Sequence, residues 1–316
     1  MDISLMVEGQ NGLTWERWSH ILALAERLHI PSVFRSDHYF IGEQQDSLEA
    51  YLSFVMAASE TEHIHFGPLV TPVTFRRPVD IGRMSAQIDA LSGGRFVCGL
   101  GAGWNEEEHT AYGLPFPAVG ERFDRLENAI QLMQALWTQS PATHDGAFFS
   151  LKEADCLPRP ASGRPPLLLG GTGEKRTLKL VAQYADEWNA TRLTVTDLAH
   201  KNEVLAAHCE NVGRDPGTIR RSMMTFGVIG PQSLIDKGTE RLMSMYAPGQ
   251  NMAPDEFRKN LAAGGAIVGG TDQIVDTLGK LAEHGIQEIQ FQHFFFDNDE
   301  IPEYLASDIA PQVASL

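Results

Sequence analysis

The chain alternates short apolar segments with amphipathic segments of helical periodicity, and this alternation constrains its fold more than any other feature. The predicted strands are residues 3–7, 33–34, 64–70, 96–100, 167–169, 187–190, 221–229 and 286–294. Phe96 to Leu100 has no polar alternation, which is typical of a strand covered on both faces. A strict β-α rhythm implies parallel strands joined by right-handed crossovers. We therefore predict an α/β fold with eight parallel strands.

Eight such units predict a (β/α)8 TIM barrel, and a doubly wound sheet is the competing architecture. A barrel of this kind usually takes about 250 residues, so a chain of 316 residues has room for insertions. We predict one insertion after strand 4, at about 141–166, where Asp145-Gly146 indicates a hairpin. A second insertion is predicted after strand 7, at about 247–268. We expect residues 1–316 to form a single domain.

Charge and cysteine content exclude several classes of protein. With 25 Lys plus Arg against 41 Asp plus Glu, the net charge is −16, and an acidic surface repels nucleic acid. The three cysteines have no metal-like spacing and predict a reducing compartment without a disulfide framework. No apolar run approaches the roughly 18 residues of a membrane span, and we see no secretion signal. We expect a cytoplasmic protein that binds neither nucleic acid nor a membrane.

Polar and glycine residues follow most of the predicted strands. In a barrel the carboxyl ends of the strands meet at one mouth, where chemistry is built. These residues are Ser36, Asp37, His38, Thr71, Gly101 to Asn105, Gly170 to Arg176, Trp188 and His293. We predict that they share one functional site.

The turn from Gly170 to Arg176 is the best candidate for binding an anion. Its members are Gly170, Gly171, Thr172, Gly173, Glu174, Lys175 and Arg176. Consecutive glycines expose backbone N–H groups, the following helix adds its positive end, and two cations stand in its first turn. No Gly-Lys-Ser or Gly-Lys-Thr follows, so this is not a Walker A loop. A tight turn with solvated cations is the alternative.

The run Gly99-Leu100-Gly101-Ala102-Gly103 does not complete a dinucleotide fingerprint, because Trp104 stands where the last glycine is required. The glycines indicate instead that the backbone packs closely against a flat ligand. Trp104 either stacks on that ligand or fills the mouth of the barrel. We assign Gly101, Gly103, Trp104 and Asn105 to a cofactor site.

Asp37 and His38 are the most plausible acid/base pair, because histidine titrates near neutral pH and a carboxylate can hold its tautomer. A strand-end histidine can also be purely structural. His293 follows an apolar run and is interpreted as a core histidine with its hydrogen bonds satisfied. Glu106 to His109 is interpreted as a solvated helix start and not as a metal site, and no His-Glu-x-x-His is present. We predict no bound metal.

Taken together, these residues resemble the bacterial luciferase-like family of flavin and deazaflavin oxidoreductases. The resemblance spans about residues 1 to 294, and the combination of its glycine blocks is fairly specific. The matching segments are Ser36–His38, Thr71-Pro72 with Phe75-Arg76, Ser92–Phe96 leading into Gly99–Asn105, Glu121–Phe123, Leu169–Arg176 and Ala185–Asn189.

This resemblance implies a TIM barrel that holds an isoalloxazine-like ring at the strand ends. It implies a cis peptide at Pro68-Leu69 or its neighbour behind the ring, with the cofactor phosphate at Gly170 to Gly173. The residues it assigns to the cofactor also include Ser36, His38, Thr71, Lys175, Arg176 and Trp188. The branch that uses the deazaflavin coenzyme F420 matches best, and FMN is the alternative. Sugar-phosphate dehydrogenases of the family carry a glutamate at the position of Trp104, so their activity is not implied.

Three functions follow as hypotheses. The first is an oxidoreductase that transfers a hydride between coenzyme F420 and a small organic substrate, with Asp37 and His38 as catalytic residues. The second is an FMN-dependent monooxygenase that uses O2 and receives reduced flavin from a separate reductase. The third is a flavin-binding relative without enzymatic activity. We expect a homodimer, with a substrate pocket walled by aromatic residues of or near the two insertions (Phe116, Phe148, Phe149, Tyr246 and Phe257).

Overall fold

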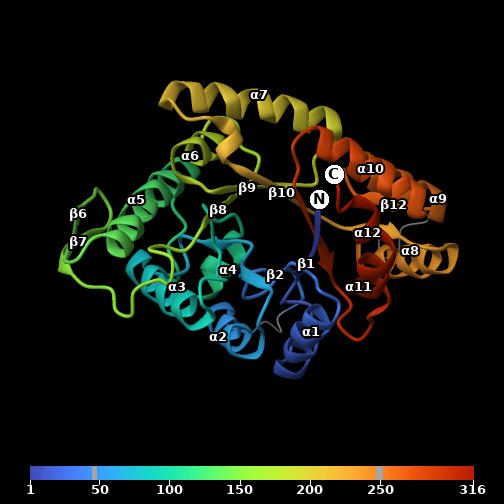
Figure 1. The fold of residues 1–316 in the computed structure, drawn as a ribbon, viewed down its shortest axis with the longest axis horizontal. Helices are drawn as coiled ribbons and strands as arrows, with labels where there is room; N and C mark the ends of the chain where they lie inside the picture. The colour runs from blue at the N-terminus through green and yellow to red at the C-terminus, as the bar shows by residue number, and fades with distance from the viewer. Residues whose placement is uncertain (45–47, 247–251) are drawn as a thin grey trace.

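A computed structural model describes residues 1–44, 48–246 and 252–316. Its main sheet is parallel throughout, in the order β3-β2-β1-β13-β10-β9-β8-β5-β4. A parallel bridge joins Phe66 of β3 to Phe96, which leads into β5, so that the sheet nearly closes into a barrel (Figure 1). The strands are β1 Asp2–Val7, β2 Ser32–Arg35, β3 His65–Pro68, β4 Thr71–Pro72, β5 Cys98–Gly101, β8 Leu167–Gly170, β9 Glu187–Thr191, β10 Arg220–Thr225 and β13 Glu288–His293. The predicted TIM barrel is confirmed.

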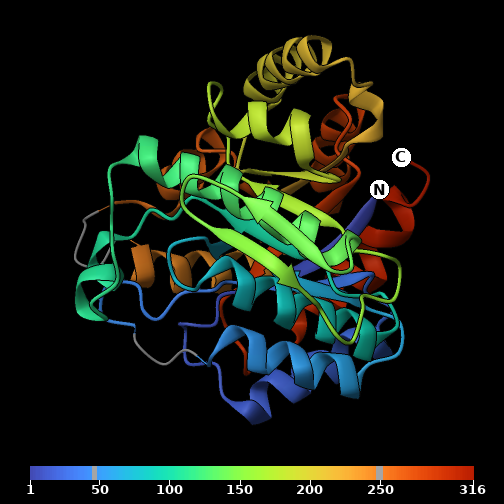
Figure 2. The same ribbon diagram turned by 90° about the vertical axis from the view of Figure 1, so that its left-hand side faces the viewer.

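The helices surround the barrel on its outside (Figures 1 and 2), except α4, which lies across the middle of the ring in Figure 1. They are α1 Trp15–Arg27, α2 Ala50–Glu60, α3 Pro78–Ser92, α4 Glu106–Ala111, α5 Val119–Thr138, α6 Thr177–Tyr184, α7 Val195–Val212, α8 Gln232–Tyr246, α9 Pro254–Ala263, α10 Thr271–Glu283, α11 Glu300–Tyr304 and α12 Ala310–Val313. Thr14 caps α1, because its Oγ1 accepts a hydrogen bond from the backbone N of Arg17. None of the described helices is long and apolar enough to span a membrane.

The third predicted strand is interrupted at its carboxyl end. β3 ends at Pro68, a cis peptide joins Leu69 to Val70, and β4 begins at Thr71. The cis bond is therefore at the neighbour of the Pro68-Leu69 bond. A Cβ placed on Gly99 would lie 1.9 Å from the carbonyl oxygen of Pro68. The glycine therefore allows the next strand to approach the backbone of this interrupted one.

The prediction of one continuous seventh strand over residues 221–229 is wrong. β10 stays in the barrel up to Thr225, and the chain then leaves it. β11 (Gly227–Ile229) pairs in parallel with β12 (Ile267–Gly269) in a separate two-stranded sheet. The reason is a satellite core, formed by Phe226, Val228, Ile235, Leu242, Phe257, Ala266 and Phe294. Apolar residues beyond Thr225 are buried there and not in the barrel.

The hairpin predicted near Asp145-Gly146 is present. β6 (Ala142–Asp145) pairs antiparallel with β7 (Ser150–Ala154). Asn128 of α5 holds its turn, because its Oδ1 accepts hydrogen bonds from the backbone N of Phe148 and Phe149. The sequence also predicts that a helix begins at Ser47. This residue, part of the second insertion and the side chain of Tyr246 lie outside the described residues. In the described part, α2 begins at Ala50 with Glu49 as its cap.

Candidate active site

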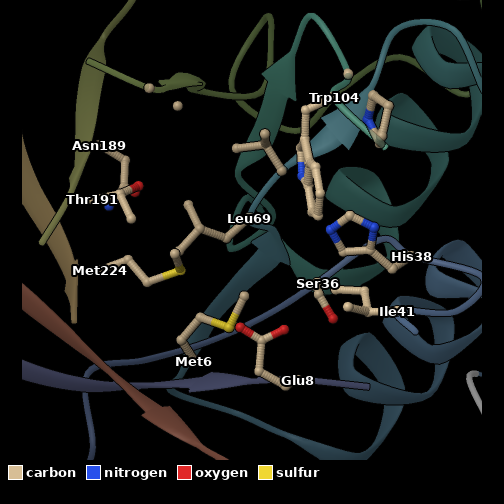
Figure 3. Close-up of a pocket in the computed structure, with 15 residues that line it drawn as sticks. Met6, Glu8, Ser36, His38, Ile41, Leu69, Trp104, Asn189, Thr191 and Met224 are labelled. Carbon is tan, nitrogen blue, oxygen red and sulfur yellow. The ribbon is translucent and has the colours of Figure 1, made fainter. Parts of the chain in front are cut away.

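A cavity of about 290 Å³ opens among the carboxyl ends of the barrel strands (Figure 3). Its lining residues are Met6, Glu8, Ser36, His38, Ile41, Leu69, Val70, Pro72, Gly103, Trp104, Gly170, Gly171, Asn189, Thr191 and Met224. These come from eight different strands or the loops that follow them. The cavity therefore occupies the mouth of the barrel, where the sequence predicted the site.

Seven of the predicted site residues line this cavity. They are Ser36, His38, Leu69, Gly103, Trp104, Gly170 and Gly171. The other predicted residues are not among its lining: Asp37, Pro68, Thr71, Gly101, Asn105, Thr172, Gly173, Lys175, Arg176 and Trp188. Most of this second group lies directly behind or beside the lining. The prediction did not include Met6, Glu8, Ile41 or Met224, which the sequence does not distinguish from ordinary strand-end residues.

His38 forms a hydrogen bond with Glu108. Its Nδ1 lies 2.8 Å from Oε2 of Glu108, and the Glu108 side chain is fully buried. The other carboxylate oxygen accepts hydrogen bonds from the backbone N of Tyr39 at 2.5 Å and of Phe40 at 3.2 Å. Because every contact of this carboxylate is with a donor, Nδ1 of His38 carries a proton and donates it. Nε2 has no hydrogen-bond partner among the described residues and is the nitrogen left to exchange a proton.

The surroundings of His38 favour its protonated form. Burial alone lowers the pKa of an imidazole, but the hydrogen bond and the negative charge of Glu108 outweigh burial. Glu8 and Asp37 add smaller contributions in the same direction. The pKa of His38 is consequently raised above its ordinary value.

The interpretation of Glu106 to His109 as a solvated helix start is wrong for its second half. α4 begins at Glu106, and Asn105 caps it by accepting a hydrogen bond from the backbone N of Glu107. Glu106 and Glu107 are exposed, but Glu108 and His109 are buried. Both nitrogens of His109 are within hydrogen-bond distance of oxygens, those of the Asn105 carbonyl and the Thr74 hydroxyl. Within this acidic run, no sequence signal separates Glu108 from its neighbours.

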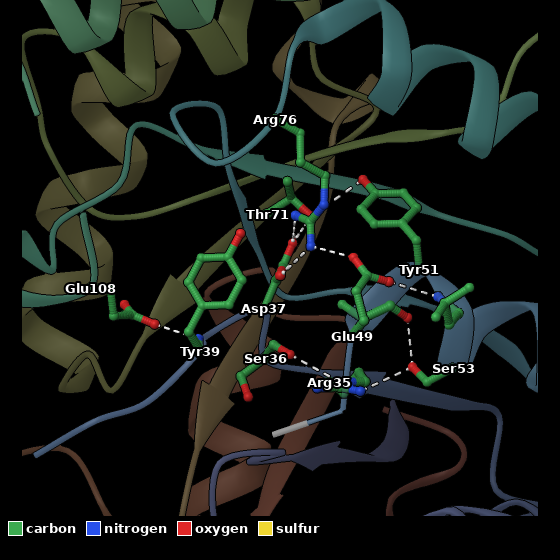
Figure 4. A network of polar contacts seen from close by, with 12 residues as sticks. Arg35, Ser36, Asp37, Tyr39, Glu49, Tyr51, Ser53, Thr71, Arg76 and Glu108 are labelled. Atoms are coloured by element: carbon green, nitrogen blue, oxygen red, sulfur yellow. Dashed lines mark hydrogen bonds and ion pairs between the residues drawn. The ribbon is translucent and has the colours of Figure 1, made fainter. Parts of the chain in front are cut away.

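The carboxylate beside His38 in sequence does not contact its ring. Asp37 instead accepts hydrogen bonds from the Thr71 hydroxyl at 2.7 Å and from both Nη atoms of Arg76 at 2.6 and 3.1 Å. Arg76 also donates to Glu49 at 2.5 Å, and its guanidinium lies over the ring of Tyr51 (Figure 4). This network ties the end of β2 to β4 and to the start of α2. Asp37 and Thr71 thus hold together the strand ends that carry His38 and the cis peptide.

The predicted anion-binding turn borders the cavity through Gly170 and Gly171. Trp188 is fully buried, and its Nε1 donates a hydrogen bond to the carbonyl oxygen of Gly171 at 2.8 Å. The φ angle of Gly171 is +122°, a conformation that favours glycine. Of the two predicted cations, Lys175 is exposed and Arg176 forms an ion pair with Asp124. The backbone of the turn therefore faces the cavity, while one of its cations is partly neutralised.

Trp104 lies at the rim of the cavity and is 65% exposed. Its ring meets the imidazole of His38 edge-on, with 5.5 Å between the ring centroids. It does not fill the mouth, and one face of the indole is available to a ligand. Figure 3 shows the indole and the imidazole side by side on one wall of the cavity.

The expected aromatic walls lie elsewhere. Phe116 packs against His109 and Arg122, Phe148 lies beneath the guanidinium of Arg125, Phe149 lines a separate cleft, and Phe257 belongs to the satellite core. His293 also borders a different pocket, and its Nε2 has no partner, so its hydrogen bonds are not satisfied as expected. Burial lowers the pKa of His293 to about 4. None of these residues lines the cavity at the mouth.

Residues 4–288 match the family model described as luciferase-like monooxygenase. This match covers most of the chain. The chain belongs to the luciferase-like monooxygenase family. Its barrel and the cis peptide at the end of the third strand agree with the resemblance seen in the sequence.

Several of the relatives that the chain matches are named for coenzyme F420. The chain is 35% identical to an F420-dependent glucose-6-phosphate dehydrogenase of Intrasporangium calvum over 166 residues, 51% of this chain and 48% of the relative. It is 29% identical to an F420-dependent hydroxymycolic acid dehydrogenase of Mycobacterium tuberculosis over 225 residues, 70% and 60% of the two chains. The chain thus matches only about half of the length of these relatives.

A solved structure of an F420-dependent secondary alcohol dehydrogenase with an F420-acetone adduct has the same fold. It superposes with a TM-score of 0.81 over 99% of this chain and 98% of that one, at 20% identity. At this identity the likeness concerns the fold alone. Among the described residues, no group of three or more His, Cys, Asp or Glu side chains is placed to hold a metal ion.

Proposed function

We propose that this protein is an oxidoreductase that transfers a hydride between coenzyme F420 and a small organic substrate at the mouth of its barrel. The observation that carries the proposal is His38, which is held at Nδ1 by the buried Glu108 and leaves Nε2 free beside the cavity. The family membership and the F420-dependent relatives support the choice of cofactor.

The residues around the cavity fit a flat heterocycle with a phosphate-bearing side chain. Leu69 and Val70 present the interrupted third strand to the cavity, and Gly170 and Gly171 expose backbone at its edge. We assign the ring to the surface of Leu69 and Val70 and the phosphate to the Gly170–Gly173 turn, where backbone N–H groups and the start of α6 favour an anion. When bound there, a deazaflavin supplies two-electron hydride chemistry.

His38 is assigned the proton that accompanies hydride transfer. Its Nε2 accepts the proton of a substrate hydroxyl during oxidation and returns it during reduction. Glu108 stabilises the imidazolium form and fixes the ring, because it occupies Nδ1 in either state. Asp37 is assigned a positioning role, since Arg76 and Thr71 already occupy its oxygens.

A titration of the purified protein with F420 and with FMN, side by side, tests the choice of cofactor. We expect saturable binding of F420 that is lost in Gly171→Val, because a branched side chain at φ +122° distorts the turn. Gly279→Ala is the matched control, since a Cβ at Gly279 in α10 meets nothing within 4 Å. Binding of FMN alone, with oxygen uptake on adding reduced FMN, would contradict the proposal.

That outcome would favour the second function, an FMN-dependent monooxygenase served by a separate reductase, which the name of the family supports. Failure of both cofactors to bind would favour a non-enzymatic relative. We further propose that the protein is cytoplasmic and forms a homodimer. Sedimentation of the purified chain tests its oligomeric state.

A further inference from the structure

We propose that the substrate of this site carries a protonated nitrogen, which binds to the carboxylate of Glu8 on the wall of the cavity. The proposal deepens the proposed function and rests on it, because it concerns the chemical class of substrate at the same site. Glu8 follows β1, and its side chain points into the cavity near Ser36 and Met6 (Figure 3). The residue is 8% exposed.

The hydrogen bonds around Glu8 fix its carboxylate as an acceptor. The backbone N of Gly9 donates to Oγ of Ser36 at 3.0 Å, and the Ser36 hydroxyl donates to Oε1 of Gln10 at 2.7 Å. Gln10 in turn donates through Nε2 to Oε2 of Glu8 at 2.8 Å. Gln292 of β13 donates to Oε1 at 2.5 Å. The donors in this series of hydrogen bonds all point toward Glu8, and its carboxylate has lone pairs left to accept further hydrogen bonds.

Glu8 differs from the other buried carboxylates around the mouth in the charge of its partners. Asp37 is paired with the guanidinium of Arg76, and Glu108 contacts His38. The side-chain partners of Glu8 are the neutral amides of Gln10 and Gln292, and its carboxylate forms no ion pair with the described residues. No Lys or Arg lines the cavity in the described part of the chain. The charge of Glu8 is therefore not compensated by a cation in direct contact, and His38 and the buried Arg35 offset it only from a distance.

An uncompensated charge in a poorly hydrated site is costly, and a ligand of opposite charge removes that cost. An ammonium group both neutralises Glu8 and supplies N–H donors to its open lone pairs. A neutral hydroxyl supplies one donor without the charge, and a phosphate or carboxylate is repelled. The site thus differs from what a phosphorylated sugar requires, although one relative is named for such a substrate.

Three matched probes test the proposal: benzylammonium, benzyl alcohol and benzoate, titrated calorimetrically into the protein with and without bound F420. We expect benzylammonium to bind ~10-fold or more tightly than benzyl alcohol, as is typical of a charged hydrogen bond over a neutral one. Benzoate should bind most weakly. In Glu8→Gln the preference for the ammonium probe should disappear, while the affinity for benzyl alcohol stays the same.

Two variants serve as controls. Glu106→Gln removes the same charge from an exposed position near the mouth and should leave the preference intact. Glu8→Asp keeps the charge and should keep most of the preference, which separates loss of charge from loss of folding. Equal binding of all three probes to the wild type, or an unchanged preference in Glu8→Gln, would overturn the proposal.

The two proposals fail in different ways. If F420 binds but the ammonium preference is absent, the substrate class is wrong and the cofactor assignment stands. If the preference is present but F420 does not bind, the cofactor assignment fails. If Glu8→Gln weakens F420 binding and leaves the probe preference unchanged, Glu8 serves the cofactor ring and the inference is overturned.

Discussion

The two ends of the barrel both bury carboxylates beside a cavity, but they differ in what those carboxylates contact. At the mouth, Glu108 holds the ring of His38. At the opposite end, the N-terminal end of the strands, Glu187 accepts a hydrogen bond from the hydroxyl of Ser222 and Glu288 accepts one from the hydroxyl of Ser32. Arg220 lies within ion-pair distance of both carboxylates. These side chains border a cavity of about 370 Å³, slightly larger than the one at the mouth.

The difference shows that cavity size does not identify the functional end of this barrel. At the N-terminal end the partners are hydroxyls and a guanidinium, so the carboxylate of Glu187 is itself the titrating group. At the mouth the partner is an imidazole whose second nitrogen is free beside the cavity and can pass a proton to a bound molecule. We therefore infer that the mouth supports chemistry and that the opposite end stabilises the barrel. Four predictions test this distinction, from the largest expected effect to the smallest.

Gly99→Ala should have the largest effect, because the added Cβ forces β5 away from the end of β3. The added Cβ would lie 1.9 Å from the backbone oxygen of Pro68, which cannot move aside without distorting β3. We expect the free energy of unfolding to fall by about 3 kcal/mol or more, measured by urea denaturation. Gly279→Ala should instead stabilise α10 by up to about 1 kcal/mol. Similar stability of both variants would show that this close approach is not required.

His38→Asn should lower the rate of F420 reduction or oxidation about 10²–10⁴-fold, the usual contribution of a general acid or base. F420 binding should persist, because the phosphate turn is untouched. Glu187→Gln, at the other end, should retain the full rate. A comparable loss of rate in both variants would remove the functional distinction between the two ends.

Glu108→Gln should lower the pKa of His38, since the charge and hydrogen bond that overcome its burial are weakened. In the wild type, NMR titration of the ring should give a pKa above the ordinary value of about 6.5. In the variant, the titration should shift to lower pH, and the pH profile of the rate should shift with it. An unchanged titration would mean that Glu108 does not control His38.

The smallest effect concerns stability and pH at the N-terminal end. Burial, followed by the charge of Glu288, raises the pKa of Glu187 to about 7 from 4.5. The folded state therefore binds the proton more tightly than the unfolded state. The stabilisation that the proton on Glu187 gives the folded state is fully present below pH 4.5 and is lost as pH rises to about 7. Denaturation at several pH values should show the free energy of unfolding falling across this range, and Glu187→Gln should abolish the fall. Equal pH dependence in the variant would contradict this assignment.

Local patterns in the sequence predicted the fold because they are decided by neighbouring residues. The sequence predicts a cap at Thr14 and a helix over residues 271–283 from side chains within one helical turn, and the structure has both. The seventh strand shows where such reasoning ends. Residues 221–229 have strand character throughout, but only the position of β12 decides that β11 leaves the barrel after Thr225.

The site was predicted in outline but not in its contacts. His38, Gly103 and Gly171 line the cavity as expected, because each follows a recognisable strand. The sequence favoured Asp37 as the partner of His38, since it is adjacent. The actual contact comes from Glu108, which α4 places 70 residues further along the chain. Such a contact depends on tertiary packing, and no spacing rule anticipates it.

The most direct test of the central claim is an NMR titration of F420 into protein with labelled histidines. His38 lines the cavity at the mouth and His65 borders the cavity at the N-terminal end. We predict that F420 shifts the ring resonances of His38 and leaves those of His65 in place. A shift of His65 with no change at His38 would contradict the account.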